Sequence, residues 1–457
     1  MRHTFNSTII RSYDIRGIVN KTLDTNDARV IGHLFALSLK TNKVVNVGYD
    51  GRISSVPLKD ELIKGLIEGG ADVNDIGLGP TPMLYYSCYY NSAEAGIMIT
   101  GSHNPSNHNG FKIVKNNLPF YGKDLITLSN NAKDYELGSR KGKSKKIEIK
   151  DHYIEKLHSS LKQSKKINIA WDSGNGAAGQ IMKSLSKSVL GKSILLYEDI
   201  DGNFPNHHPD PSDPENLKDL IKCVKENKLD FGIAFDGDGD RIGLVDDLGR
   251  VVPGDLLLLI FAQELIKKKQ EATIIGDVKC SQVLFDYIEK LGGKAIMYKT
   301  GHSLIKDCMK KENADLAGEM SGHIFFADGY YGFDDALYAS VRLINLFSES
   351  DKKLSEIIDD FPKLFNTPEI RIDCDDNEKF SVIDSVLANQ KNKKYSSIDG
   401  VRVDLGFGWW LLRASNTQAA IVLRCEGNSI ENLNQIIKTV KYELNKVSPE
   451  LSKQILT

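Results

Sequence analysis

Three stretches of the chain repeat the same pattern of apolar and polar positions. Each begins with a short apolar run that ends in an aspartate, and these runs cover residues 44–50, 167–172 and 272–277. An amphipathic segment follows each run, at residues 58–67, 181–190 and 283–291. A second short apolar run comes near residues 73–76, 194–197 and 295–298. Strand, helix and strand in this order are typical of βαβ units. The repeat therefore predicts three similar mixed-sheet α/β domains.

The pattern changes after Phe361-Pro362. Residues 370–372 and 401–404 alternate like strands, and residues 430–447 have a helical pattern. Because this tail lacks the repeat, we expect a separate C-terminal α+β domain. The expected domains cover residues 1–150, 151–252, 253–366 and 367–457.

Composition narrows the classes of protein. Hydrophobic residues make up 41% and charged residues 26% of 457 residues, which are ordinary globular values, and the net charge is −2. We therefore expect neither a nucleic acid nor a membrane surface as partner. The longest apolar run, residues 256–262, is too short to span a bilayer.

The cysteines and the N-terminus indicate the compartment. Six widely spaced cysteines form no Cys-x-x-Cys pair, which favours reduced thiols over a zinc site or a disulfide framework. Residues 1–6 lack the apolar core of a signal peptide. We expect a cytoplasmic protein.

The most informative motif is Asp236-Gly237-Asp238-Gly239-Asp240-Arg241, between strand-like runs at 231–235 and 242–245. In a near-extended loop its alternate carboxylates point the same way, so three negative charges converge and require a cation. Oxygen ligands favour Mg²⁺, and Arg241 suits a phosphate beside it. An acidic hairpin turn is the plain alternative. An EF-hand loop is excluded because Arg241 and Asp247 stand where Gly and Glu are needed.

A second motif, Thr-Gly-Ser-His-Asn-Pro at residues 100–105, follows the apolar run 95–99. A serine on a Gly-flanked loop at a strand end is expected to be exposed enough to act as a nucleophile, which makes Ser102 a candidate. His103 and Lys112 could place charge against a phosphoryl group on its oxygen. A capped turn is the simpler interpretation of this loop alone. The chain has no Gly-x-Ser-x-Gly elbow here, which weakens an acyl-transfer hypothesis.

Two more loops suit a phosphorylated sugar. In Gly-Glu-Met-Ser-Gly-His at 318–323, the carboxylate and the hydroxyl can hydrogen-bond to vicinal hydroxyl groups. Residues 300–303 add His302, although a lone histidine is more often a structural hydrogen-bonder. Arg-Ala-Ser-Asn-Thr at 413–417 can hold a dianionic phosphate without a metal. Ser-Asn-Thr is also common in surface turns.

In this order the four loops resemble the motifs of the α-D-phosphohexomutase family, in particular its bacterial phosphomannomutase/phosphoglucomutase members. Further similarity lies in residues 13–17, 201–205, 277–281 and 331–335. The resemblance covers nearly the whole chain. It implies four domains around a central cleft, with one motif in each domain.

The resemblance also implies the roles of single residues. Ser102 would carry the phosphoryl group, and Ser102, Asp236, Asp238 and Asp240 would hold Mg²⁺. The catalytic set it implies is Ser102, Arg16, His103, Lys112, Arg241 and His302, with Arg16, Lys112 and His302 similar to the family's acid/base and charge-stabilising groups. The substrate-binding set it implies is Tyr13, Lys279, Gly301, His302, Glu319, Met320, Ser321, Gly322, His323, Arg413, Ala414, Ser415, Asn416 and Thr417.

The implied activity is the interconversion of hexose 1-phosphate and hexose 6-phosphate, of mannose or glucose, with hexose 1,6-bisphosphate as intermediate. The expected partners are small hexose phosphates, and the expected state is a monomer. Phosphoglucosamine mutase is the alternative within the family, although Met320 favours a sugar without a 2-amino group. A sugar-phosphate phosphatase and a catalytically silent binding protein are the alternatives from other classes.

Overall fold

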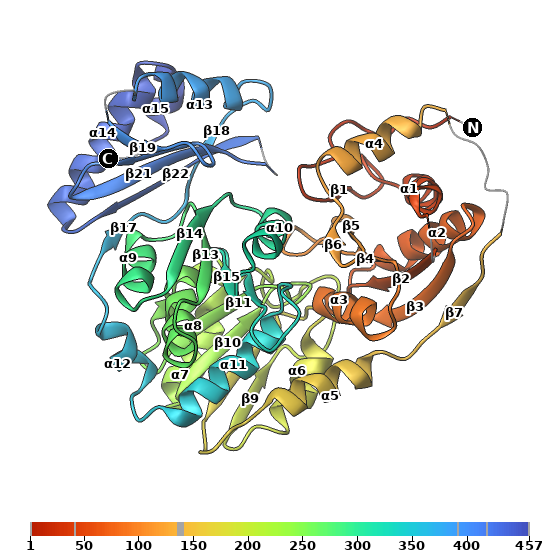
Figure 1. Cartoon of the computed structure of the whole chain (residues 1–457), viewed down its shortest axis with the longest axis horizontal. Coiled ribbons are helices and arrows are strands. Elements are labelled where there is room, and N and C mark those ends of the chain that lie inside the picture. Colours follow the sequence, from red (N-terminus) through yellow and green to blue (C-terminus); the bar gives the residue numbers. More distant parts are fainter. Residues whose placement is uncertain (1, 41–42, 135–140, 391–392, 417–418, 456–457) are drawn as a thin grey trace.

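The computed structural model describes residues 2–40, 43–134, 141–390, 393–416 and 419–455. They form four sheets, each with its own helices (Figure 1). We call the units around these sheets domains I to IV, in chain order. The expected fold class, three α/β domains followed by an α+β domain, is confirmed.

The elements of domain I are β1 (Ile15–Ile18), α1 (Thr25–Ser38), β2 (Val44–Tyr49), α2 (Ser55–Glu68), β3 (Asp72–Leu78), α3 (Thr81–Tyr90), β4 (Ala95–Ile99), β5 (His108–Lys115), β6 (Leu118–Pro119), α4 (Lys123–Asn131) and β7 (Ser144–Lys146). Those of domain II are α5 (Lys150–Ser160), β8 (Ile169–Asp172), α6 (Gly179–Ser186), β9 (Ser193–Leu196), the 3₁₀ helix η1 (Pro214–Leu217), α7 (Lys218–Asn227), β10 (Phe231–Phe235), β11 (Ile242–Asp246) and β12 (Val251–Val252).

The elements of domain III are α8 (Gly254–Lys268), β13 (Thr273–Asp277), α9 (Gln282–Lys290), β14 (Lys294–Tyr298), α10 (His302–Glu312), β15 (Leu316–Gly318), β16 (Ile324–Phe326), α11 (Ala336–Glu349) and α12 (Leu354–Asp359). Those of domain IV are β17 (Phe365–Asn366), β18 (Ile370–Asp373), α13 (Lys379–Ala388), β19 (Lys394–Ser396), β20 (Val401–Asp404), β21 (Gly408–Ala414), β22 (Ala420–Gly427), α14 (Ile430–Asn445) and α15 (Pro449–Lys453).

The first three sheets share one strand order. The repeated βαβ unit supplies two neighbouring parallel strands, which are β2 and β3, β8 and β9, and β13 and β14. A third parallel strand, β4, β10 or β15, pairs with the first strand on its other side. An antiparallel strand, β5, β11 or β16, then pairs with the third. The loop between the third strand and the antiparallel strand is therefore equivalent in all three domains.

That equivalent loop carries residues of the predicted site in each of the three domains. It holds Ser102 in domain I, the three aspartates in domain II and Glu319 in domain III. In domain IV the sheet is antiparallel, and Arg413 lies at the end of β21, just before the loop to β22. Each predicted motif thus lies at the carboxyl end of a strand.

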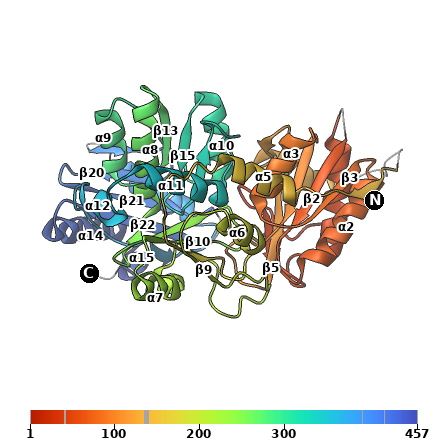
Figure 2. The ribbon, with the colours of Figure 1, turned by 90° about the horizontal axis from the view of Figure 1, so that it is seen from below.

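The hydrophobic core explains why the tail is distinct. One buried cluster runs from α3 of domain I through domains II and III, and α5 lies where these domains meet (Figure 2). A second cluster lies on the α1 and α2 face of the first sheet. Domain IV packs around its own cluster, with Trp410 fully buried in it. None of the described helices is both long and apolar enough to cross a membrane.

A buried hydrogen bond fastens domain II to domain III. The Tyr153 hydroxyl on α5 donates to the two carboxylate oxygens of Asp335, at 2.9 and 2.8 Å. Asp335 also caps α11 by accepting from the backbone N–H of Tyr338. Both side chains are buried, and burial raises the pKa of Asp335 to about 6.

We expect Tyr153→Phe to weaken this contact by about 1–3 kcal/mol, because the variant keeps the ring but leaves a buried carboxylate short of a donor. The urea midpoint of unfolding should fall. Tyr442→Phe, at a tyrosine that is 62% exposed, is the matched control and should unfold like the parent protein. Equal midpoints for the two variants would contradict this role of Tyr153.

Candidate active site

The three aspartates of domain II converge as their spacing predicts. Asp236, Asp238 and Asp240 are fully buried, and one carboxylate oxygen from each lies within 4.8 Å of the other two. The Oδ1 atoms of Asp238 and Asp240 have no hydrogen-bond partner among the described residues. Burial, and then the charges of Asp238 and Asp240, raises the pKa of Asp236 well above its usual range. Buried carboxylate oxygens without partners suit a hard divalent cation such as Mg²⁺.

Lys112 of domain I supplies a positive charge to the same cluster. Its Nζ donates to Asp238 Oδ2 at 2.7 Å and also to Asp240 Oδ2. Burial alone would lower the pKa of Lys112, but Asp238 and Asp240 raise it. The ammonium group therefore stays charged, and it ties the β5 strand of domain I to residues 236–241 of domain II, which we call the metal loop after their predicted role.

Ser102 faces the metal loop, but it is not exposed as expected. Its Oγ donates to Asp236 Oδ2 at 2.8 Å, and the residue is 1% exposed. The expectation of an exposed serine was wrong because the metal loop packs directly on this loop: a side chain at Gly237 would place its Cβ 2.3 Å from the Ser102 carbonyl oxygen. His103 Nδ1 lies 3.2 Å from Ser102 Oγ. Burial, and then the charge of Arg241, lowers the pKa of His103, so this ring is neutral.

Two arginines frame these loops. Arg16 donates to Asp14 Oδ2 at 2.5 Å and to Asn104 Oδ1 at 3.1 Å, which places it against the Ser102 loop. Arg241 donates from Nε to His323 Nε2 at 2.9 Å, and the two residues form a β-bridge between domains II and III. The metal loop and the predicted sugar loop therefore lie side by side.

The predicted sugar loop, residues 318–323 of domain III, lies among buried polar groups. Glu319 is 2% exposed and accepts from the Gly301 backbone N–H at 2.6 Å. His302 and His323 stack with ring centroids 5.5 Å apart. His323 Nδ1 lies 3.1 Å from Asp334 Oδ2.

The other predicted sugar-binding residues of domain III differ in burial and in their contacts with domain IV. Met320 and Ser321 are half-buried, and Gly322 is buried. The thioether sulfur of Met320 contacts Arg424 of domain IV. Lys279 is buried and donates to Glu369 Oε1 at 2.5 Å.

The loop of domain IV reaches both domain I and domain III. Arg413 donates from Nε to Asp399 Oδ2 at 2.9 Å, and the same oxygen accepts from Thr300 N at 3.1 Å. Asn416 donates to the Tyr13 hydroxyl, which donates in turn to the Thr300 carbonyl at 2.6 Å.

Ala414 and Ser415 are buried beside Arg413, whereas Thr417 lies outside the described residues. These contacts connect all four predicted loops into one assembly.

The charged residues of this assembly that were not among the predicted site residues include Arg52, Asp334, Asp399 and Glu369. The available signal for Arg52 was its place two residues after Asp50, where an apolar run ends. Asp334 lay within a segment noted only for its similarity to the family. Asp399 and Glu369 stand in segments without a recognisable motif, and only their contacts reveal them.

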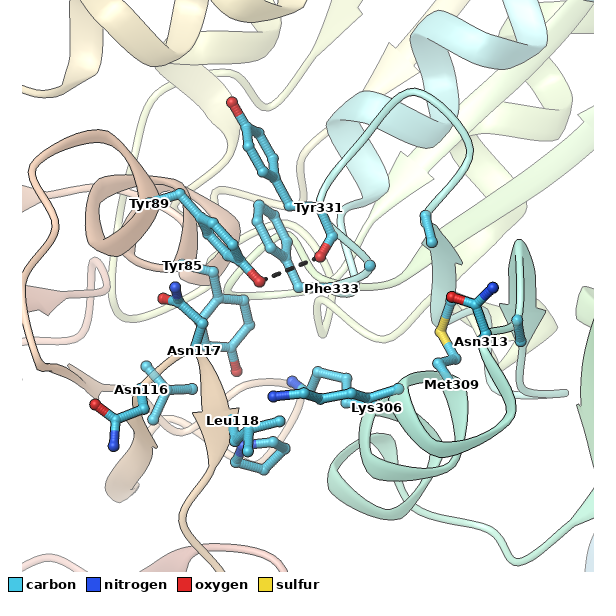
Figure 3. A pocket seen from close by; sticks show the side chains of 16 residues that line it. Tyr85, Tyr89, Asn116, Asn117, Leu118, Lys306, Met309, Asn313, Tyr331 and Phe333 are labelled. Carbon is cyan, nitrogen blue, oxygen red and sulfur yellow. Dashed lines mark hydrogen bonds between the residues drawn. The ribbon is translucent and has the colours of Figure 1, made fainter.

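A pocket of about 390 Å³ lies outside this assembly, between the β5–β6 hairpin and α10 (Figure 3). Aromatic rings form one wall, and the Tyr89 hydroxyl donates to the Tyr331 carbonyl there. None of the predicted site residues lines it. Lys306, one of its lining residues, donates from Nζ to Asp334 Oδ1 at 2.8 Å.

Comparison with known proteins agrees with the four-loop site. The family models described as phosphoglucomutase/phosphomannomutase alpha/beta/alpha domains I, II and III match residues 7–139, 151–249 and 253–365, and the model of the C-terminal domain matches residues 369–441. A phosphomannomutase/phosphoglucomutase of Pseudomonas putida is 46% identical over 448 residues, 97% of each chain. One from Pseudomonas aeruginosa is 40% identical over 452 residues, 98% of each chain.

A solved structure has the same architecture. The phosphoglucomutase/phosphomannomutase family protein of Burkholderia thailandensis superposes with a TM-score of 0.91 at 36% identity, covering 98% of this chain and 99% of that one. With family models along most of its length and relatives this similar from end to end, the chain belongs to the phosphoglucomutase/phosphomannomutase family.

Proposed function

We propose that this protein is a phosphohexomutase that interconverts hexose 1-phosphate and hexose 6-phosphate, of mannose, glucose or both. Ser102 carries the phosphoryl group, and hexose 1,6-bisphosphate is the bound intermediate. The names of the full-length relatives support this activity. The observation that carries the proposal is the contact of the Ser102 hydroxyl with Asp236, because it joins a nucleophile to a site for a divalent cation.

Phosphoryl transfer requires little covalent chemistry from a protein beyond positioning and charge stabilisation. Mg²⁺ held by Asp236, Asp238 and Asp240 would offset charge on the transferring group. Lys112 and Arg241 add positive charges at the metal loop.

In the first half of the reaction, the bond from phosphorus to Ser102 Oγ breaks. A bond forms from phosphorus to the free hydroxyl oxygen of hexose 1-phosphate, and the proton of that hydroxyl replaces the phosphoryl group on Ser102 Oγ. The bisphosphate then turns round. In the second half, the bond from the phosphorus of the 1-phosphate to the sugar oxygen O1 breaks and a bond forms from this phosphorus to Ser102 Oγ. The serine proton passes to O1, and hexose 6-phosphate is released.

The turn exchanges the two phosphates, so the phosphate that lies away from Ser102 must be bound in both orientations of the intermediate. Arg413 is suited to this because Asp399 takes only its Nε–H, which leaves the two Nη groups for a phosphate. Glu319, Ser321 and Lys279 are the residues we assign to the sugar.

A coupled assay that compares mannose 1-phosphate, glucose 1-phosphate and glucosamine 1-phosphate tests the activity. We expect turnover of the first two sugars, a phosphorylated fraction in the intact mass of the protein, and loss of both in Ser102→Ala. Release of inorganic phosphate instead of hexose 6-phosphate would identify a phosphatase. Wild-type turnover in Ser102→Ala would exclude a phosphoserine mechanism.

Removal of the divalent cation should stop the reaction, because three buried carboxylates then repel the incoming phosphate. We expect excess chelator to abolish turnover and Mg²⁺ to restore it. Calorimetry should detect Mg²⁺ binding that Asp238→Asn loses and Asp219→Asn, on the exposed face of α7, retains. Full activity in excess chelator would rule out this metal site.

Arg413→Ala should raise KM for hexose phosphates by about 10- to 100-fold, since a hydrogen bond to a charged group contributes about 1.5–3 kcal/mol. Steady-state kinetics with both phosphate positions of the sugar would measure it. Arg371→Ala, at an exposed arginine on β18 of the same domain, is the control and should leave KM unchanged. An unchanged KM in Arg413→Ala would show that residues other than Arg413 bind the phosphate.

A further inference from the structure

The loop that carries Ser102 accepts several hydrogen bonds from one buried arginine, Arg52. The Arg52 side chain has no exposed surface. Its Nη2 donates to the carbonyl oxygens of Ser102 and Asn104, at 2.7 and 2.6 Å. Its Nη1 donates to the carbonyl oxygens of Pro105 and His108, at 2.6 and 3.1 Å. A single guanidinium group therefore binds four backbone carbonyls of this loop.

The fifth N–H of Arg52 completes a closed network with Asp50. The Nε–H donates to Asp50 Oδ2 at 3.1 Å, and the same oxygen accepts from Gly101 N at 3.1 Å. Asp50 Oδ1 accepts from the Ser55 hydroxyl at 2.6 Å and from Arg52 N at 3.0 Å. All five guanidinium N–H groups thus have fixed acceptors, so Arg52 has no donor left for a substrate.

The backbone of Ser102 needs such support. Its φ of 49° lies in the left-handed region, which disfavours residues other than glycine. A residue held there costs about 1–3 kcal/mol and persists only where its surroundings over-determine it. On one side the Ser102 carbonyl meets the metal loop at Gly237, and on the other it accepts from Arg52. These contacts aim the Ser102 hydroxyl at Asp236.

We infer that Arg52, aligned by Asp50, is a positioning residue for phosphoryl transfer. It keeps the Ser102 Oγ in line with the phosphate without contacting the sugar. This inference rests on the mutase function proposed above. Lysine cannot replace Arg52, because an ammonium group is a point donor with three N–H groups and cannot reach four separate carbonyls.

Arg52→Lys tests the inference in the full-length enzyme with Mg²⁺ present. We expect kcat to fall by about 100-fold, the loss that a misplacement of about 1 Å produces. KM for hexose phosphates should stay within about twofold of the wild-type value, because the residues of domains III and IV to which we assign sugar and phosphate binding are unchanged. The ³¹P resonance of phosphoserine should shift toward its position in the denatured protein, an effect that reduced stability alone does not produce at a temperature where the variant is folded.

Arg342→Lys is the matched control. Arg342 is also largely buried, and it pairs with Glu264 and Asp328 in domain III, away from the site. It should keep the wild-type kcat and ³¹P resonance. Asp50→Asn, which preserves volume, is the second variant if Arg52→Lys fails to fold, and it should show the same selective loss of kcat.

The possible results separate this inference from the proposed function. An active wild type with an unaltered kcat and ³¹P resonance in Arg52→Lys and Asp50→Asn would overturn the positioning role and leave the mutase function standing. An equal rise in KM and fall in kcat would also overturn it. A wild type that turns over none of the three sugar phosphates would remove the proposed function and this inference together.

Discussion

The arrangement of the domains depends on a cluster of buried negative charges and on the cation that compensates them. Three aspartates of one short loop are fully buried, and Lys112 from another domain lies among them. Removing one partner from a buried charge cluster costs about 3–5 kcal/mol, so domains I and II are held in register by the same groups to which we assign the chemistry. A site for transferring a phosphoryl group needs this balance, because each additional negative charge must meet a cation already in place.

The repeated sheet explains how loops from distant parts of the chain come to face one another. Each of domains I, II and III ends its third parallel strand in a loop before an antiparallel strand, and each loop carries a different chemistry. The loops meet through the contact of Ser102 with Asp236 and of Arg241 with His323. One architecture thus supplies, at equivalent positions, the serine that we propose as nucleophile, the three aspartates that could hold a metal, and the loop that we propose for the sugar.

Domain IV is organised differently because its task is different. It packs around its own core, and many of its contacts with the site are ionic or polar. Lys279 pairs with Glu369, and Arg413 pairs with Asp399. Both cations are ones that we assign to the phosphorylated substrate, so carboxylates hold them when no substrate is present. In our proposal, Lys279 exchanges Glu369 for the substrate, whereas Arg413 keeps Asp399 and binds the phosphate with its Nη groups. A small apolar contact of Trp409 and Leu411 with Val278 also joins domain IV to domain III.

Much of this protein follows from local sequence. Apolar periodicity predicted the three βαβ repeats and the distinct tail, because alternation and amphipathic spacing are properties of single strands and helices. The convergence of Asp236, Asp238 and Asp240 also followed, since an extended loop fixes the direction of alternate side chains. Other features depend on contacts between residues far apart in the chain. Burial of Ser102 reverses the expected exposure, and it arises because a second domain packs against its loop. The position of Lys112 among the aspartates likewise exists only when two separate sheets are brought together. The network of Arg52 with four carbonyls exists because the segments after β2 and β4, far apart in the chain, are neighbours in one sheet. Sequence periodicity encodes which face of an element is apolar, but not which distant polar group that element will meet.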